Sequence, residues 1–239
     1  MCWNATASVA MVGFGGAAVA VAVMRREPRA IWLTLAYFTA MEGLQASGYA
    51  VIDECGTLGN RTITQLSYLH IVFQPLILNG FAMAIAPAPV SWRVQRRVYG
   101  VAAVCSALML LRLVPFDWAG PCIAGTSLCA EAFCTVSGNW HIAWQVPLNG
   151  LYRPLSALAG MPVEFPDYFI AVFVLPLFYG AWRFALLHLL AGPVLAWTLT
   201  SNPDEMPAVW CLFSIGILLI GLSPFIRHQV MGAHRPAVA

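Results

Sequence analysis

The chain contains 239 residues, of which 60% are hydrophobic and only 9% are charged. Because a soluble globular domain carries about 25% charged residues, this composition predicts an integral membrane protein whose main partner is the lipid bilayer. The formal net charge of +2 gives no information about nucleic acid, but no basic run resembles a binding patch, so we expect no nucleic-acid partner.

All twelve basic residues are arginine, so the chain has no lysine. Retinal and pyridoxal phosphate both need a lysine for their Schiff base, and the phosphate-binding loop of P-loop ATPases needs one as well. These three classes of protein are therefore excluded. A high content of Ala and Gly without lysine is typical of a GC-rich bacterial genome, which predicts the inner membrane of a bacterium as the location.

Apolar segments long enough to cross a bilayer recur along the whole chain, which predicts a single all-α transmembrane domain over residues 1–239. We expect seven transmembrane helices from these segments. The first is not a signal peptide, because its positive charges follow the apolar run instead of preceding it. The expected spans cover approximately residues 5–23, 30–52, 66–87, 98–115, 167–182, 184–200 and 207–226.

The arginines predict the orientation, because cytoplasmic loops of membrane proteins are enriched in basic residues. An N-terminus outside and a C-terminus inside place nine of the twelve on the cytoplasmic side. Most acidic residues of the connections then lie outside. The nine arginines are Arg25, Arg26, Arg29, Arg93, Arg96, Arg97, Arg183, Arg227 and Arg235.

The longest connection, residues 116–166, lies outside in this topology. Its second part, residues 141–160, is apolar enough to resemble a span, but a span here would invert the chain and move Arg183 and Arg227 outside. We therefore expect residues 141–160 to form a re-entrant or interfacial helix over the outer mouth. Irregular backbone at that depth must be buried in protein or line a wet cavity.

Six of the seven cysteines fall on or near the outer side. Because disulfides persist in oxidising compartments, we expect an outer cap braced by two disulfides, whose pairing the sequence leaves open. A thiol oxidase is the alternative, but such enzymes normally carry a more closely spaced reactive pair. The four cysteines expected in the two bonds are Cys55, Cys122, Cys129 and Cys134.

Glu42 stands near the middle of the second expected span. Ionisable residues at this depth are costly, and they mark functional sites by default. Gln45 and Tyr49 follow Glu42 by three and seven residues, so the three side chains share one helix face. Arg112, one turn below the outer end of the fourth span, is a candidate ion-pair partner for Glu42.

The pattern His-Ile-x-aromatic-Gln occurs twice. His70 and Gln74 lie in the third span, and His141 and Gln145 lie in the expected re-entrant helix, each pair four residues apart and thus on one helix face. A proline after each pair frees a backbone carbonyl beside the histidine. Two equivalent ligand positions, an old duplication and chance are all compatible with the repeat.

Three stretches carry a family resemblance: the opening Met-Cys-Trp, the "EGLQASGY" of the second span and the "HIVFQP" of the third. They are similar to an uncharacterised family of small bacterial multi-span membrane proteins, and similar openings occur in some algal and large-virus proteins. The resemblance covers most of the chain and implies no known activity. The positions of interest that it implies are Cys2, Trp3, Glu42, His70, Gln74 and Pro75.

The first functional hypothesis is a cofactor site in the outer half of the bilayer. Glu42, His70 and His141 would bind a transition metal such as Zn or Fe, or the two histidines would bind a haem, for membrane-embedded catalysis or redox chemistry. Glu42 and Arg112 would be the catalytic residues, although the sequence does not decide whether the protein is an enzyme. Polar side chains around the cofactor would come from Gln45, Tyr49, Gln74 and Gln145.

The second hypothesis is a transporter or receptor that binds a small polar ligand in the same pocket, with Arg112 opposite an anionic group. The third is an accessory subunit of a membrane complex, whose polar faces pack against a partner. Each histidine also has a simpler structural interpretation, because a lone histidine within a membrane more often hydrogen-bonds a neighbouring helix than binds a metal.

The orientation can be tested with reporter fusions at residues 95 and 128. A fusion at residue 95 should be active only as a cytoplasmic reporter, and a fusion at residue 128 only as an external one, because the arginine-rich and cysteine-rich connections lie on opposite sides of the bilayer. Paired alkaline phosphatase and fluorescent-protein activities measure this. A cytoplasmic residue 128 would contradict the whole topology.

Overall fold

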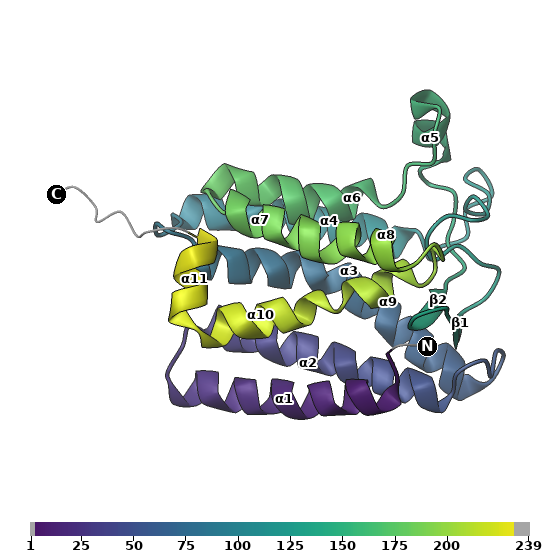
Figure 1. Cartoon of the computed structure of the whole chain (residues 1–239). Helices are drawn as coiled ribbons and strands as arrows, with labels where there is room; N and C mark the ends of the chain where they lie inside the picture. Colours follow the sequence, from purple (N-terminus) through teal and green to yellow (C-terminus); the bar gives the residue numbers. More distant parts are fainter. Residues whose placement is uncertain (1–2, 232–239) are drawn as a thin grey trace.

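The structure, a computed structural model, describes residues 3–231 and is mostly helical. Its first half consists of four helices that run side by side and alternate in direction (Figure 1). The Asn4 side chain starts the first helix by accepting a hydrogen bond from the backbone N–H of Ala7, 3.0 Å away. The four are α1 (Ala5–Met24), α2 (Arg29–Ala50), α3 (Leu58–Ile85) and α4 (Trp92–Leu111).

The second half is built from interrupted helices. Two of the interruptions, η1 (Ile170–Val174) and η3 (Leu190–Val194), are π-helical, a rare geometry that is often found at functional sites. The first interrupted helix comprises α6 (Pro166–Phe169), η1 and the 3₁₀ helix η2 (Leu175–Tyr179). The second comprises α7 (Trp182–Leu189), η3 and α8 (Leu195–Leu199), and the third α9 (Met206–Trp210) and α10 (Phe213–Leu222).

The longest connections gather at one end of the bundle (Figure 1). We call residues 51–57, 112–165 and 200–205 the cap. The cap contains an antiparallel hairpin of β1 (Cys134–Ser137) and β2 (Ile142–Gln145), and a short helix, α5 (Arg153–Ala159). Asn60 of α3 fixes the hairpin to the bundle: its side chain donates to the carbonyl of Thr135 at 2.8 Å and accepts from the N–H of Thr135 at 2.9 Å.

Four helices of the described chain are long and apolar enough to cross a membrane, which indicates a multi-pass membrane protein. They are α1, α3, α4 and the run Trp182–Leu199; the bent pair of Met206–Leu222 with α11 (Pro224–Met231) would be a fifth. The expectation of seven spans is therefore only partly met. The helix Pro166–Tyr179 is shorter than a bilayer requires, and α2 carries polar residues such as Glu42 and Gln45.

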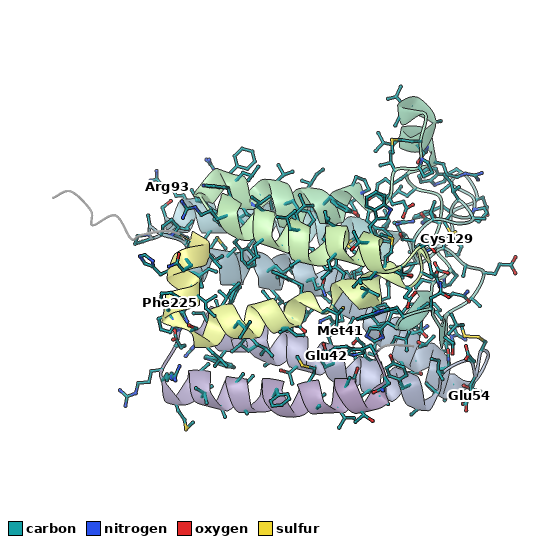
Figure 2. All side chains as sticks on the ribbon, viewed as in Figure 1. Met41, Glu42, Glu54, Arg93, Cys129 and Phe225 are labelled. Carbon is teal, nitrogen blue, oxygen red and sulfur yellow. A yellow bond between two sulfur atoms is a disulfide. The ribbon has the colours of Figure 1, made fainter. Side chains whose placement is uncertain are left out.

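Charge is divided between the two ends of the bundle. Arg93 and Glu54 lie at opposite ends (Figure 2). Because the helices alternate in direction, eight of the nine arginines expected inside fall at the end away from the cap, whereas Arg235 lies outside the described residues. The cap end carries the acidic residues Asp53, Glu54, Asp117, Glu131, Glu164, Asp204 and Glu205.

The prediction of a re-entrant or interfacial helix over residues 141–160 is wrong. Residues 142–145 form strand β2, and only α5 at residues 153–159 is helical. Ile142, Trp144 and Val146 alternate with smaller or polar residues, a pattern that favours a strand, and Pro147 cannot continue a helix. His141 and Gln145 are therefore not neighbours on a helix face, and the His-Ile-x-aromatic-Gln repeat lies on a helix once and on a strand once.

The prediction of two disulfides among four cap cysteines is confirmed. Cys55 pairs with Cys134, which joins the α2–α3 connection to β1, and Cys122 pairs with Cys129 within the long connection. Cys105 and Cys211 are buried free thiols, and Cys2 lies outside the described residues. The pairing could not be deduced from the sequence because it depends on how the hairpin packs against α3.

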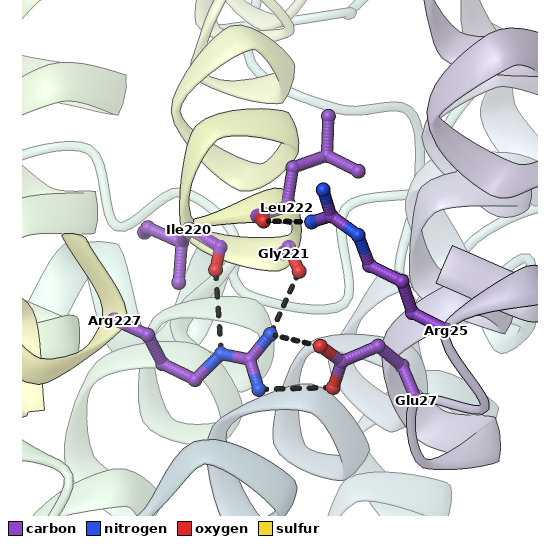
Figure 3. A network of polar contacts seen from close by, with 6 residues as sticks. All are labelled: Arg25, Glu27, Ile220, Gly221, Leu222 and Arg227. Carbon is purple, nitrogen blue, oxygen red and sulfur yellow. Dashed lines mark hydrogen bonds and ion pairs between the residues drawn. The ribbon is translucent and has the colours of Figure 1, made fainter. Parts of the chain in front are cut away.

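At the opposite end, two arginines complete the C-terminus of α10 (Figure 3). Pro224 has no N–H, so the carbonyl of Ile220 lacks its normal helical donor and faces Nε of Arg227 at 3.4 Å. Arg227 also donates to the carbonyl of Gly221 at 2.7 Å and forms a two-pronged ion pair with Glu27 at 3.0 and 3.2 Å. Arg25 donates to the carbonyl of Leu222 at 2.9 Å. These contacts join the α1–α2 turn to the last helices.

The two disulfides should contribute unequally to stability. They close segments of 79 and 7 residues, for which loop-closure entropy predicts about 4–5 and about 2–3 kcal/mol respectively. Replacing Cys55 and Cys134 by alanine should therefore lower the thermal unfolding midpoint more than the matched replacement of Cys122 and Cys129. Equal midpoints for the two double variants would contradict the assigned pairing.

Candidate functional site

A cavity of about 420 Å³ lies beneath the cap, between α3, the two interrupted helices that contain η1 and η3, and the α9–α10 segment. Its walls are mainly apolar. The surrounding aromatic side chains come from distant parts of the chain: Phe38, Phe165, Tyr168, Phe169, Trp210 and Phe213. A concave and largely apolar cavity with a few polar groups is the usual form of a small-molecule site.

Both π-helical segments adjoin the cavity. Phe169, immediately before η1, and Pro193, within η3, are part of its wall. Pro193 has no N–H to donate, and the regular helical hydrogen-bond pattern changes around it. The widened turns shift the side chains away from regular helical positions, so the irregular backbone and the cavity occupy the same place in the fold.

His188 of α7 is the histidine that lines the cavity, and it is only 2% exposed. Its Nε2 atom accepts a hydrogen bond from the indole N–H of Trp210 at 2.9 Å, which assigns the hydrogen of the neutral ring to Nδ1. The ring stacks on Phe213 with centroids 4.2 Å apart. The buried Nδ1 atom has no hydrogen-bond partner within residues 3–231, so His188, a residue of the cavity wall, holds an unused donor that is closed to solvent.

Gly192 in η3 allows Trp210 to reach His188. A Cβ atom at position 192 would lie 2.2 Å from Nε1 of Trp210 and 2.6 Å from its Cδ1. Any side chain there would displace the indole. The small residue, the π-helical turn and the Trp210–His188 hydrogen bond therefore form one local arrangement.

Gln74 supplies a second polar group. Its Oε1 atom accepts a hydrogen bond from the hydroxyl of Tyr168 at 2.6 Å, and both residues line the cavity. Gln74 lies one residue before Pro75 on α3, which continues through the proline. The sequence singled out Gln74 as a cofactor-binding residue, and it is the member of the predicted site that lines this cavity.

Residues of the cap line the cavity at the cap end of the bundle. The backbone N–H of Ser127 donates to the carboxylate of Glu164 at 2.9 Å, and both residues belong to the cavity wall. Phe165 adopts φ 47° and ψ 48°, a left-handed conformation that is unusual for an aromatic residue. Its ring lies 4.3 Å from the guanidinium carbon of Arg112, which also faces Tyr152 at 5.5 Å.

Glu205 anchors the hairpin of the cap. Its carboxylate is fully buried and accepts hydrogen bonds from the backbone N–H groups of Asn139, Trp140 and His141, with Asn139 at 3.2 Å, and from the hydroxyl of Thr200. Successive backbone donors of this kind form an anion-binding concavity. A Cβ at Gly138 would lie 2.7 Å from Cδ of Glu205, so a glycine is needed beside the carboxylate.

His141 is buried in the same region. Its Nδ1 atom accepts from the N–H of Ile142 at 2.7 Å and lies 2.9 Å from the hydroxyl of Tyr49, whose ring stacks on it. Burial lowers the pKa of His141 to about 3, so the ring is neutral at physiological pH. A neutral histidine whose Nδ1 accepts the N–H of Ile142 and whose ring stacks on Tyr49 contributes to packing in the cap.

The predicted metal site is not assembled. No group of three or more His, Cys, Asp or Glu side chains within residues 3–231 is arranged to hold a metal ion. His70 stacks on Tyr37 with centroids 3.7 Å apart, His141 belongs to the cap, and Glu42 accepts from Ser214 at 3.1 Å. The candidate ion pair of Glu42 with Arg112 is not formed in the described residues: Arg112 faces aromatic rings, and the salt bridge found there joins Arg227 and Glu27.

Gln45 and Tyr49 share a face of α2 with Glu42, as expected, but the three contact different partners. Gln45 reaches the carbonyl of Ala208 at 3.5 Å, and Tyr49 reaches the carbonyl of Trp3 at 3.0 Å. Gln145, at the end of β2, lies against Asp204, a cap carboxyl whose pKa is raised by burial. These side chains do not converge on one pocket.

Sequence reasoning missed His188, Trp210 and Glu205. Gly192-Pro193 inside an apolar segment was the signal available, because this pair marks a helix irregularity. In the sequence, Glu205 is one of several acidic residues in the expected outer connections. Its backbone partners at residues 139–141 become visible only in the folded hairpin.

The family model described as "Family of unknown function (DUF5765)" matches residues 6–231. This chain belongs to DUF5765. The matched region extends over the helix bundle, the cap and the cavity. The chain matches no curated protein and no solved structure.

The expected resemblance to an uncharacterised family is thus supported at the level of DUF5765. The matched region contains Glu42, His70, Gln74 and Pro75. It begins after the Met-Cys-Trp opening, which therefore takes no part in the match. Of that opening, Cys2 lies outside the described residues, whereas the Trp3 indole donates to Ser8 at 3.0 Å.

Proposed function

We propose that this DUF5765 protein is a multi-span membrane protein that binds a small, mainly apolar molecule in the cavity beneath its cap. The observation that carries the proposal is the aromatic-lined cavity of about 420 Å³, whose wall includes His188 with an Nδ1–H that has no partner within residues 3–231. A buried donor without an acceptor costs about 1–3 kcal/mol. A ligand oxygen that accepts this hydrogen bond would remove the penalty.

The chemistry of the wall defines the ligand class. Aromatic and proline side chains favour a flat apolar body, and His188 favours an acceptor such as a ketone or ester carbonyl. The amide of Gln74, oriented through its oxygen by Tyr168, supplies a second polar contact. Glu164 is the one charged side chain of the cavity wall and lies at the cap, so a strongly anionic ligand is disfavoured.

The proposal corresponds to the receptor or transporter hypothesis and moves its site from Glu42, His70 and His141 to the cavity. The scattered positions of these three residues support the move. Zn, Fe or haem binding at the original residues stays an untested prediction. The division of arginines and acids between the two ends supports seven spans, an outside N-terminus and the inner membrane of a bacterium as parts of the proposal.

Benzophenone, an apolar ketone that crosslinks on illumination, tests the site in purified protein reconstituted in lipid. Wild-type protein should give saturable adducts in the peptide containing Met206 and Trp210, because these residues line the cavity. His188→Phe keeps the ring shape but removes the donor, so half-saturation should need about two- to tenfold more benzophenone.

Phe178→Leu is the matched control, because Phe178 is 76% exposed and faces away from the cavity wall. It should leave saturable labelling unchanged. Labelling that does not saturate, or that is identical in wild type and His188→Phe, would contradict the proposal.

A further inference from the structure

A second buried polar site lies where α2 meets the α9–α10 segment, on the face of α2 that carries Glu42 (Figure 2). Glu42 and Gln45 are 2% and 1% exposed. Oε1 of Glu42 accepts from the hydroxyl of Ser214 at 3.1 Å, and the amide nitrogen of Gln45 lies 3.5 Å from the carbonyl of Ala208. Both side chains therefore point at the same segment of the opposing chain.

Each of these two side chains has one oxygen without a hydrogen-bond donor in the described residues. Oε2 of Glu42 and Oε1 of Gln45 are buried and have no hydrogen-bond partner within residues 3–231. The residues are three apart on one helix face, so their side chains are neighbours. Two unsatisfied acceptor atoms on neighbouring side chains fit a proton or a cation held by both, because buried polar groups in proteins are almost always satisfied.

Within residues 3–231, no cationic side chain is paired with Glu42. In the described chain the salt bridge found is that of Glu27 with Arg227, and Arg112 is engaged with Phe165 and Tyr152. The titratable groups near Glu42 are Cys211 of the α9–α10 segment and Tyr49 of α2, and α1 carries none. An unbalanced carboxylate within the bilayer costs a few kcal/mol.

The opposing backbone is irregular. α9 ends at Trp210 and α10 begins at Phe213, and between them the N–H of Cys211 bonds to the carbonyls of Pro207 and Ala208, and that of Leu212 bonds to the carbonyl of Val209. Interrupted helices in membrane proteins present carbonyl oxygens that coordinate sodium ions or protons. The Ala208 carbonyl is the one that Gln45 already approaches.

We propose that Glu42, Gln45 and Ser214 form a binding site for one unit of positive charge, either a sodium ion or a proton. The donor atoms are oxygens, which suit a hard cation rather than Zn or Fe. A single carboxylate neutralises one charge, so a divalent ion would leave a net positive charge in the bilayer. In the protonated form, the proton resides on Oε2 of Glu42 and is donated to Oε1 of Gln45.

The site is independent of the cavity ligand and does not rest on the proposed function. A cation here changes the contact between α2 and the α9–α10 segment, whose residues Pro207, Trp210 and Cys211 also line the cavity. The two sites thus share the α9–α10 segment while using different side chains.

Dicyclohexylcarbodiimide, which reacts with protonated carboxyl groups buried in a membrane, tests the site by mass spectrometry of the reconstituted protein. Glu42 should be modified in choline chloride, more slowly as pH rises. If sodium is the ligand, modification should slow roughly tenfold when sodium chloride replaces choline chloride at about ten times the dissociation constant. Glu27, paired with Arg227, is the internal control and should stay unmodified.

Gln45→Leu is the decisive variant, because it keeps Glu42 and removes the second oxygen. Sodium protection that is lost in Gln45→Leu supports the sodium form. A pH dependence without sodium protection, displaced to a different pH in Gln45→Leu, supports the proton form. Absence of modification at every pH, or identical behaviour of wild type and Gln45→Leu in both salts, would overturn the proposal.

Discussion

The Glu205 carboxylate, held by three successive backbone N–H groups, is the interaction on which the outer half of this structure depends. Glu205 lies at the start of α9, and its carboxylate accepts hydrogen bonds from the turn of the β-hairpin at residues 138–141. The neighbouring Asp204 carbonyl accepts from the N–H of Trp144 at 2.9 Å, and the Leu128 carbonyl accepts from Val146 at 2.8 Å. The hairpin, the cysteine-rich loop and α9 are therefore fixed to one another, and residues of the loop and of α9 line the cavity.

The bilayer imposes the second constraint, because polar groups within it must be satisfied by the protein. Most of the buried polar residues obey this rule: Asn79, for example, donates to the carbonyls of Pro75 and Ala171 and accepts from Tyr179. The exceptions are informative. Within residues 3–231 the exceptions include His188 beside the cavity and Glu42 with Gln45 beside the α9–α10 break, which retain unused atoms. These three residues lie where helices are interrupted, and these are the places where we propose ligands.

The sequence predicted the features that arise from composition and local pattern. Apolar runs predicted the helices, the arginines predicted which connections share an end, and cysteine placement predicted two disulfides in the cap. The helix expected around His141 was wrong, because Cys134–Ser137 pairs with Ile142–Gln145 in a hairpin, and a single sequence does not reveal that pairing. Long-range contacts such as those of Glu205 and Trp210 have no local signal, because their partners lie 22 to 66 residues away.

The most direct test of the central role of Glu205 is hydrogen–deuterium exchange of the backbone amides of Asn139, Trp140 and His141. Glu205→Gln removes the charge, and hydrogen bonds to charged groups contribute about 1.5–3 kcal/mol, so exchange at these amides should accelerate about tenfold or more. The matched variant Glu131→Gln, at an exposed acid of the same cap, should not change it. Equal protection of the three amides in wild type and Glu205→Gln would contradict the account of the cap given above.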